Sequence, residues 1–193
     1  MGKATLLILA LLFGSPLLAQ DHVVQLRTPV HITKKLGENW FLAGWMIGNV
    51  RQAQPDNINL FGGLGYKRNN WWLETLVQRQ WSTKGHQWQL NFRFNRDFGK
   101  RANLYLELYP VSSRRSFSEV VIFDYRLSDR WKIGVETENL HKRGRDSYGG
   151  GSRLSFRLVN RGPVTLWVTG TYHFRNQGEP RFFRTYVITT VRF

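Results

Sequence analysis

Residues 88 to 95 read Trp88-Gln89-Leu90-Asn91-Phe92-Arg93-Phe94-Asn95. Apolar and polar side chains alternate at every position, which is typical of a β-strand with one apolar face and one polar face. The same period of two recurs in residues 103–109, 121–127, 153–158 and 164–174. The sequence therefore predicts an all-β protein built from many strands of this kind.

Short polar turns separate the strands at nearly constant intervals, beginning at residues 36, 67, 98, 127 and 159. Longer polar segments lie between them, at about residues 51–56, 82–86, 110–116, 140–147 and 175–180. Such alternation of short and long connections is typical of outer-membrane barrels. Five hairpins predict ten strands of about 10 residues each, with both chain ends on the short-turn side. Eight or twelve strands remain as alternatives.

The N-terminal residues have the pattern of an export signal: Lys3 is followed by an apolar run over residues 6–13, and Ala19 offers a small residue for cleavage. An uncleaved anchor is the alternative, although the run is shorter than the roughly 20 residues that span a bilayer as a helix. We predict a signal peptide at 1–19, a lead-in segment at 20–39 and a barrel at 40–193. Pro29 interrupts the lead-in segment, which could instead be a lumen plug or an additional strand.

Composition narrows the classes of partner. Lys and Arg number 28 against 13 Asp and Glu, for a net charge of +15, and cysteine is absent. A disulfide framework and a thiolate metal site are excluded, and the five histidines lack metal-ligand spacing, so we expect no cofactor and no metal. Because the positive charges are spread along the chain, outer-membrane lipids and lipopolysaccharide are more plausible partners than nucleic acid.

The C-terminal stretch ends Tyr186-Val187-Ile188-Thr189-Thr190-Val191-Arg192-Phe193. With its terminal aromatic residue, it resembles the last strand of bacterial outer-membrane β-barrels, although Thr189 stands where a larger apolar residue is usual. The resemblance implies export through the inner membrane, an outer-membrane location and recognition by the barrel-assembly machinery. The implied assembly signal is Phe183, Val187, Val191 and Phe193.

The predicted fold is thus an antiparallel up-and-down transmembrane β-barrel. A soluble sandwich or lipocalin-like barrel is the alternative, because alternation alone does not say which face points inward. In a membrane barrel of ten strands the polar face lines a narrow lumen, and its charges are expected in pairs. The predicted lumen-lining residues are Glu74, Arg93, Glu107, Asp124, Arg126, Glu136, Glu138, Arg153, Arg157 and Arg184.

Basic residues also gather in two of the longer polar segments. A guanidinium group suits the geometry of phosphate, so these segments are candidates for contact with lipopolysaccharide or another anion. The candidates are Arg114, Arg115, Lys142, Arg143 and Arg145.

Three functional hypotheses follow. The first is a non-enzymatic barrel with a narrow, charge-lined lumen and a structural or binding role. The second is a porin-like channel for small solutes. The third is a lipid A-modifying enzyme, since some small outer-membrane barrels use His, Ser and an acidic residue near the outer leaflet. Pairing about the turn at Arg161 places His173 opposite Gly149 and near Glu138, with Ser147 as the candidate nucleophile. The sequence specifies neither the ligand nor the oligomeric state.

Overall fold

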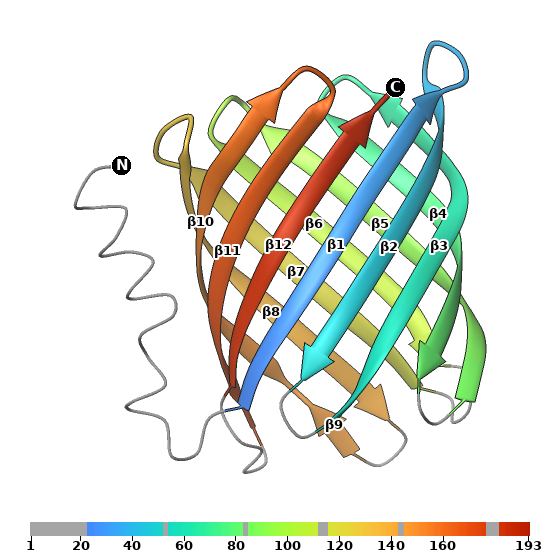
Figure 1. The fold of residues 1–193 in the computed structure, drawn as a ribbon, viewed down its shortest axis with the longest axis vertical. Helices are drawn as coiled ribbons and strands as arrows, with labels where there is room; N and C mark the ends of the chain where they lie inside the picture. Colours follow the sequence, from blue (N-terminus) through green and yellow to red (C-terminus); the bar gives the residue numbers. More distant parts are fainter. Residues whose placement is uncertain (1–22, 52–53, 83–84, 112–115, 143–144, 177–181) are drawn as a thin grey trace.

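The computed structural model describes residues 23–51, 54–82, 85–111, 116–142, 145–176 and 182–193, and they form a single sheet that closes into a barrel (Figure 1). The strands are β1 (Val23–Lys35), β2 (Trp40–Arg51), β3 (Gln54–Arg68), β4 (Trp71–Ser82), β5 (Gly85–Phe98), β6 (Ala102–Val111), β7 (Ser116–Arg126), β8 (Trp131–Lys142), β9 (Arg145–Ser147), β10 (Gly149–Arg161), β11 (Val164–Arg175) and β12 (Phe182–Arg192). Both β9 and β10 pair with β8, separated by Tyr148 alone. Together they occupy one strand position of the barrel, which therefore has eleven strands.

The expectation of ten strands is therefore wrong, and the additional strand is β1. It occupies most of the segment that the sequence suggested as a lead-in. Pro29 lies within β1 without ending it, because it falls where pairing with β12 is interrupted: that register runs from Val23 to Arg27 and resumes at Val30. A proline has no N–H to donate, so a gap in the ladder is where a strand tolerates it.

An odd number of strands sets how the barrel closes. The first and last strands point the same way, so β1 and β12 pair in parallel, from Val23 opposite Phe182 to Thr33 opposite Arg192. Figure 1 shows the two strands side by side, with the C-terminus at the end where β1 finishes. Of the two ends of the barrel, Phe193 lies on the short-turn side as predicted, whereas β1, the additional strand, begins on the opposite side.

Short turns at residues 36–39, 69–70, 99–101, 127–130 and 162–163 gather at one end of the barrel, here called the turn end. Asn69, Gly99 and Gly162 adopt positive φ there, as tight hairpin turns require. The opposite end is called the loop end. Strand pairing continues further toward it than the polar sequence suggested, since β3 already begins at Gln54 and β5 at Gly85.

The interior of the barrel is polar and its outer face is apolar. Among the described residues, nineteen polar or charged side chains are buried against five apolar ones, while large apolar side chains such as Leu42, Leu64 and Val135 are exposed. A soluble barrel would bury its apolar face, so this distribution excludes the soluble alternative. An apolar outer band is what a barrel needs to face lipid.

Candidate functional site in the barrel lumen

A buried carboxylate, that of Glu136 on β8, is the centre of the larger of two charged groups inside the barrel. Its Oε1 accepts hydrogen bonds from His173 Nε2 (2.6 Å), Arg184 Nη1 (3.1 Å) and the Tyr186 hydroxyl (2.5 Å). Its Oε2 accepts from Arg153 Nη1. These five residues are called the Glu136 network. Glu136, His173 and Arg184 have no solvent exposure, so side chains fill this level of the lumen.

Both arginines of the Glu136 network extend it to further carboxylates. Arg153 Nε lies 3.0 Å from Asp124 on β7, and Arg184 Nη2 lies 2.7 Å from Glu138 on β8. Arg184 Nε also donates to Gln25 on β1 (2.5 Å). Charges removed from water are tolerated when they are paired, and here the paired Asp, Glu and Arg side chains come from β7, β8, β10 and β12.

Glycines make these contacts sterically possible. Glu136, Gly151 and His173 are in register on β8, β10 and β11, and Asp124, Gly134 and Arg153 are in register on β7, β8 and β10. The missing side chain in the middle of each row lets the outer two meet across it. A Cβ atom on Gly151 would lie 1.9 Å from the carbonyl oxygen of Tyr172, and one on Gly134 would lie 2.5 Å from Asp124 Oδ1. Substitution at either position requires the wall to shift.

The second charged group, called the Glu74 cluster, lies on β1 to β6 and consists of Glu74, His31, Trp45, Arg93 and Glu107. Glu74 accepts from the indole N–H of Trp45 and from His31 Nε2, both at 2.9 Å. The rings of His31 and Trp45 stack at 3.9 Å. The Arg93 guanidinium packs on the Trp45 ring and donates to Glu107 (3.1 Å). Aromatic packing and the indole N–H of Trp45 therefore supply much of what arginines supply in the Glu136 network.

Toward the loop end the lumen contains a cavity of about 250 Å³, called here the amide pocket. Seven carboxamide side chains contribute to its lining: Gln25, Asn49, Asn57, Asn59, Gln78, Gln80 and Gln89. Ile47, Phe61 and Val120 supply an apolar part, and Arg27, Glu107 and Tyr109 complete it. The pocket is polar but is lined mainly by uncharged groups.

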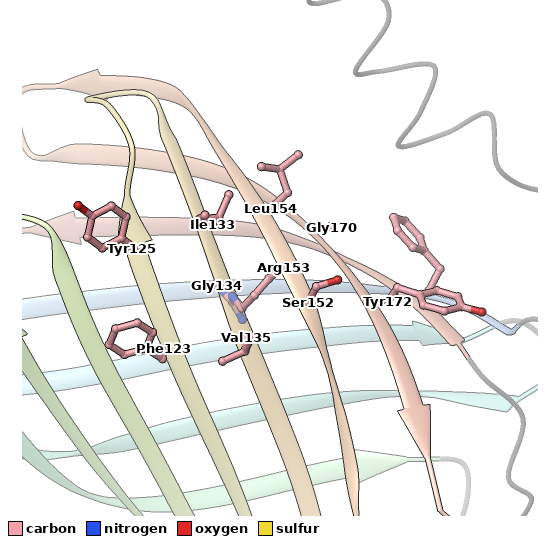
Figure 2. A pocket seen from close by; sticks show the side chains of 11 residues that line it. Phe123, Tyr125, Ile133, Gly134, Val135, Ser152, Arg153, Leu154, Gly170 and Tyr172 are labelled. Atoms are coloured by element: carbon pink, nitrogen blue, oxygen red, sulfur yellow. The ribbon is translucent and has the colours of Figure 1, made fainter.

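A larger hollow of about 550 Å³ lies on the barrel wall and is lined mainly by outward-facing apolar residues. Phe123, Ile133, Leu154 and Tyr172 contribute to it from β7, β8, β10 and β11 (Figure 2). Gly170, in register with the outward-facing Leu154, has no side chain, which leaves room for the hollow. It faces the side on which lipid is expected.

The ten charged residues selected from the sequence all lie on strands, at positions whose side chains face the interior or its rim. Asp124, Glu136, Glu138, Arg153 and Arg184 meet in one connected set, and Glu74, Arg93 and Glu107 belong to the Glu74 cluster. Arg157 lies against the ring of Trp167, 5.6 Å from its centroid. Arg126 is exposed at the turn end of β7.

The arrangement suggested for catalysis is not assembled. His173 lies opposite Gly151 rather than Gly149, because the hairpin is centred between Gly162 and Pro163 and not on Arg161, and because the register shifts by one residue between Arg157 and Val159. Its acidic neighbour is therefore Glu136 and not Glu138. The Ser147 hydroxyl accepts a hydrogen bond from Arg175 (3.1 Å). His173 is fully buried within the lumen, away from the lipid-facing surface.

The basic loop candidates fall largely beyond what the structure describes. Arg114, Arg115 and Arg143 lie outside the described residues. Lys142 and Arg145 end β8 and begin β9, and nothing is described of their side chains. Within the described ranges, no group of histidine and acidic residues could hold a metal ion.

Several interior residues were missed by the sequence reasoning. Gln25, Arg27 and His31 were overlooked because their segment was assigned to the lead-in, although all three occupy alternate positions of β1. Tyr186 was considered only as part of the C-terminal strand. The period-two alternation of residues 25, 27, 29 and 31 was the signal that could have found the first group.

Comparison with known proteins gives a likeness in fold. No family model matches the sequence, and no curated protein matches it. The structure is similar to a KdgM porin in complex with disordered oligogalacturonate, with a TM-score of 0.58 and 13% identity, covering 80% of this chain and 92% of that one. It is also similar to the NanC porin, with a TM-score of 0.55 and 10% identity, covering 77% and 84%.

In the part of the chain that the structure describes, no helix is long and apolar enough to cross a membrane. The polar interior, the apolar outer face and the likeness to two porins agree with one another. The chain is a small β-barrel of the outer-membrane type.

Proposed function

We propose that this protein is a closed outer-membrane barrel that binds a ligand from the loop end and does not conduct solutes in its resting state. The observation that carries the proposal is the Glu136 network: Glu136, His173 and Arg184 are fully buried and bonded to one another across the lumen. A water-filled path at this level would leave these side chains exposed.

The proposed orientation places the turn end in the periplasm and the loop end outside the cell, as in other outer-membrane barrels. Export by the N-terminal signal at residues 1–19, which lie outside the described residues, would precede insertion. The outer face of β12 and the residue that follows it carry Phe183, Val187, Val191 and Phe193. There the assembly machinery could recognise them.

Outer-leaflet lipids are the proposed surroundings of the loop end. On the outer face, Arg79 of β4 lies 4.9 Å from the ring centroids of both Trp81 and Trp88. Indoles favour the interface between acyl chains and headgroups, and a guanidinium held between them is well placed for a lipid phosphate.

A second candidate, a small-solute channel, is supported by the likeness to two porins. In that case the amide pocket would be the mouth of the channel, and the Glu136 network would have to part during conduction. Opening the Glu136 network would cost much free energy, because it would separate buried ion pairs and leave their charges without a partner.

Conductance in planar bilayers separates the two candidates. Folded protein is first verified by its altered gel mobility without boiling, so that electrical silence reflects a closed barrel and not absent protein. We expect no discrete steps from the unaltered chain, and steps from the double variant E136S/R184S, which removes two of the side chains that fill the lumen. Discrete steps from the unaltered chain would overturn the closed-barrel proposal.

A further inference from the structure

The amide pocket has the composition of a binding site for an uncharged, hydroxyl-rich molecule. Carboxamides each offer an acceptor and two donors without a net charge. Four neighbouring strands, β2 to β5, supply six of them: Asn49, Asn57, Asn59, Gln78, Gln80 and Gln89. Such a wall exchanges hydrogen bonds with hydroxyl groups, which are also both donors and acceptors.

The carboxamides hold one another in place through a chain of hydrogen bonds. Gln78 donates to Asn59 (2.9 Å), Asn59 donates to Asn57 (2.9 Å), and Asn49 also donates to Asn57 (2.6 Å). Gln89 donates to Gln80 (3.4 Å). Because each carboxamide fixes the orientation of the next, the amide atoms that make no hydrogen bond within the chain also have fixed positions.

Two acceptors of this wall are left over. Among the described residues, the side-chain oxygens of Asn49 and Gln89 are buried and have no hydrogen-bond partner. An unsatisfied buried acceptor costs about 1–3 kcal/mol, so buried polar atoms are normally paired. A ligand that donates hydrogen bonds from two of its groups would satisfy both atoms.

The charge of the lining favours a neutral ligand over an ionic one. The two charged residues in the lining are already paired within the wall: Arg27 lies 3.3 Å from Glu138, and Glu107 lies 3.1 Å from Arg93. Glu138 is shared with Arg175 and Arg184, but the lining itself holds one cation and one anion and so carries no net charge.

Size and shape restrict the ligand further. A cavity of about 250 Å³ is smaller than the sites of about 300–1,000 Å³ that take drug-sized molecules. Ile47 and Phe61 offer an apolar surface beside Asn49 and Asn59 on the same strands, and Val120 adds to it from β7. A single sugar ring combines hydroxyl groups at its edge with a C–H face that can lie on such a surface.

We infer that the amide pocket binds a neutral monosaccharide-sized polyol, whose hydroxyl groups donate to Asn49 Oδ1 and Gln89 Oε1. This inference deepens the proposed binding role and rests on it. It also distinguishes this lumen from that of the similar porin described with oligogalacturonate, an acidic oligosaccharide.

Titration calorimetry of the full chain in detergent tests the inference with three probes of equal ring size: glucose, glucuronate and glucosamine. We expect glucose to bind more tightly than the two charged sugars. Q89L and N49L should each weaken glucose binding roughly tenfold, the effect of losing one well-made hydrogen bond. N95L is the matched control, because Asn95 pairs with Asn103 away from the pocket.

A charged substitution of Gln89 gives a result that unfolding of the protein could not produce, namely a change in which sugar is preferred. Q89E keeps an acceptor at that position and adds a negative charge, so its preference should move from glucose toward glucosamine while its gel mobility stays that of folded protein. An unchanged preference in folded Q89E would overturn the inference.

The outcomes separate the inference from the proposed function. Absence of glucose binding, equal affinity for glucuronate, or an equal loss in N95L would overturn the ligand assignment, whatever the conductance. Conductance steps that glucose blocks would overturn the closed-barrel proposal and leave the ligand assignment standing.

Discussion

The Glu136 network and the Glu74 cluster show two ways of keeping a carboxylate inside one barrel. Glu136 is held by Arg153 and Arg184 together with His173 and Tyr186, so its negative charge is matched by formal positive charges. Glu74 is held directly by Trp45 and His31, which are donors that need carry no charge. The first arrangement relies on arginine side chains, and the second relies on the stacked rings of His31 and Trp45. The contrast implies that the two halves of the barrel should respond differently to loss of their central acid.

Removing the central carboxylates should give the largest difference. E136A leaves two buried guanidinium groups with one partner fewer, and we expect it to lower the free energy of unfolding by about 3–5 kcal/mol. E74A leaves two donors unsatisfied, for which we expect about 1–3 kcal/mol. Urea unfolding in lipid vesicles, followed by tryptophan fluorescence, measures both. Equal losses would mean that formal charge does not distinguish the two groups.

The glycine that separates Glu136 from His173 should come next. G151A places a Cβ atom against the Tyr172 carbonyl oxygen, and the forced shift should cost about 1–3 kcal/mol. The control is G62A, because a Cβ atom there meets nothing within 4 Å. The same unfolding measurement applies, and a G151A variant as stable as G62A would show that the wall yields without disturbing the network.

The smallest effects should come from single donors. W45F keeps a ring to stack on His31 but removes the indole N–H, which leaves Glu74 with one direct donor, and we expect a loss of about 1.5 kcal/mol. Y186F removes one of several donors to Glu136, and we expect about 1 kcal/mol. If Y186F proved the more damaging of the two, the Tyr186 hydroxyl would be a principal support of Glu136 and not an accessory one.

The alternation of side chains made much of the interior predictable. A period of two assigns Glu136, Arg153 and Arg184 to one face from the sequence alone, and the excess of apolar residues on the other face suits lipid. The pairing of the charges could not be predicted, because it depends on the register of each strand relative to the next. The hairpin is centred between Gly162 and Pro163 rather than on Arg161, and together with the one-residue shift between Arg157 and Val159 this makes Gly151, not Gly149, the partner of His173 and changes its acidic neighbour as well.

Two further errors have physical causes. Pro29 favoured a lead-in segment at residues 20–39, with a strand there only as an alternative, but a proline is harmful only where its N–H would be needed, and β1 places it at a gap in the parallel ladder. The amide pocket was missed because Asn and Gln near the ends of strands look like turn residues. Gln78, Gln80 and Gln89 could have been recognised by their spacing along β4 and β5, which puts them on the inner face.

The parallel pairing of β1 with β12 determines on which side of the membrane each end of the barrel lies. A chain that crosses a membrane an odd number of times has its two ends on opposite sides. With the turn end in the periplasm, a peptide tag fused ahead of Val23 would be reachable by antibody on intact cells, and one fused after Phe193 would be hidden until the outer membrane is breached. Because the chain has no cysteine, a single cysteine can be introduced at Val23 or at Leu36 and labelled with a membrane-impermeant maleimide. The reagent should label position 23 on intact cells, and position 36 only after the outer membrane is breached.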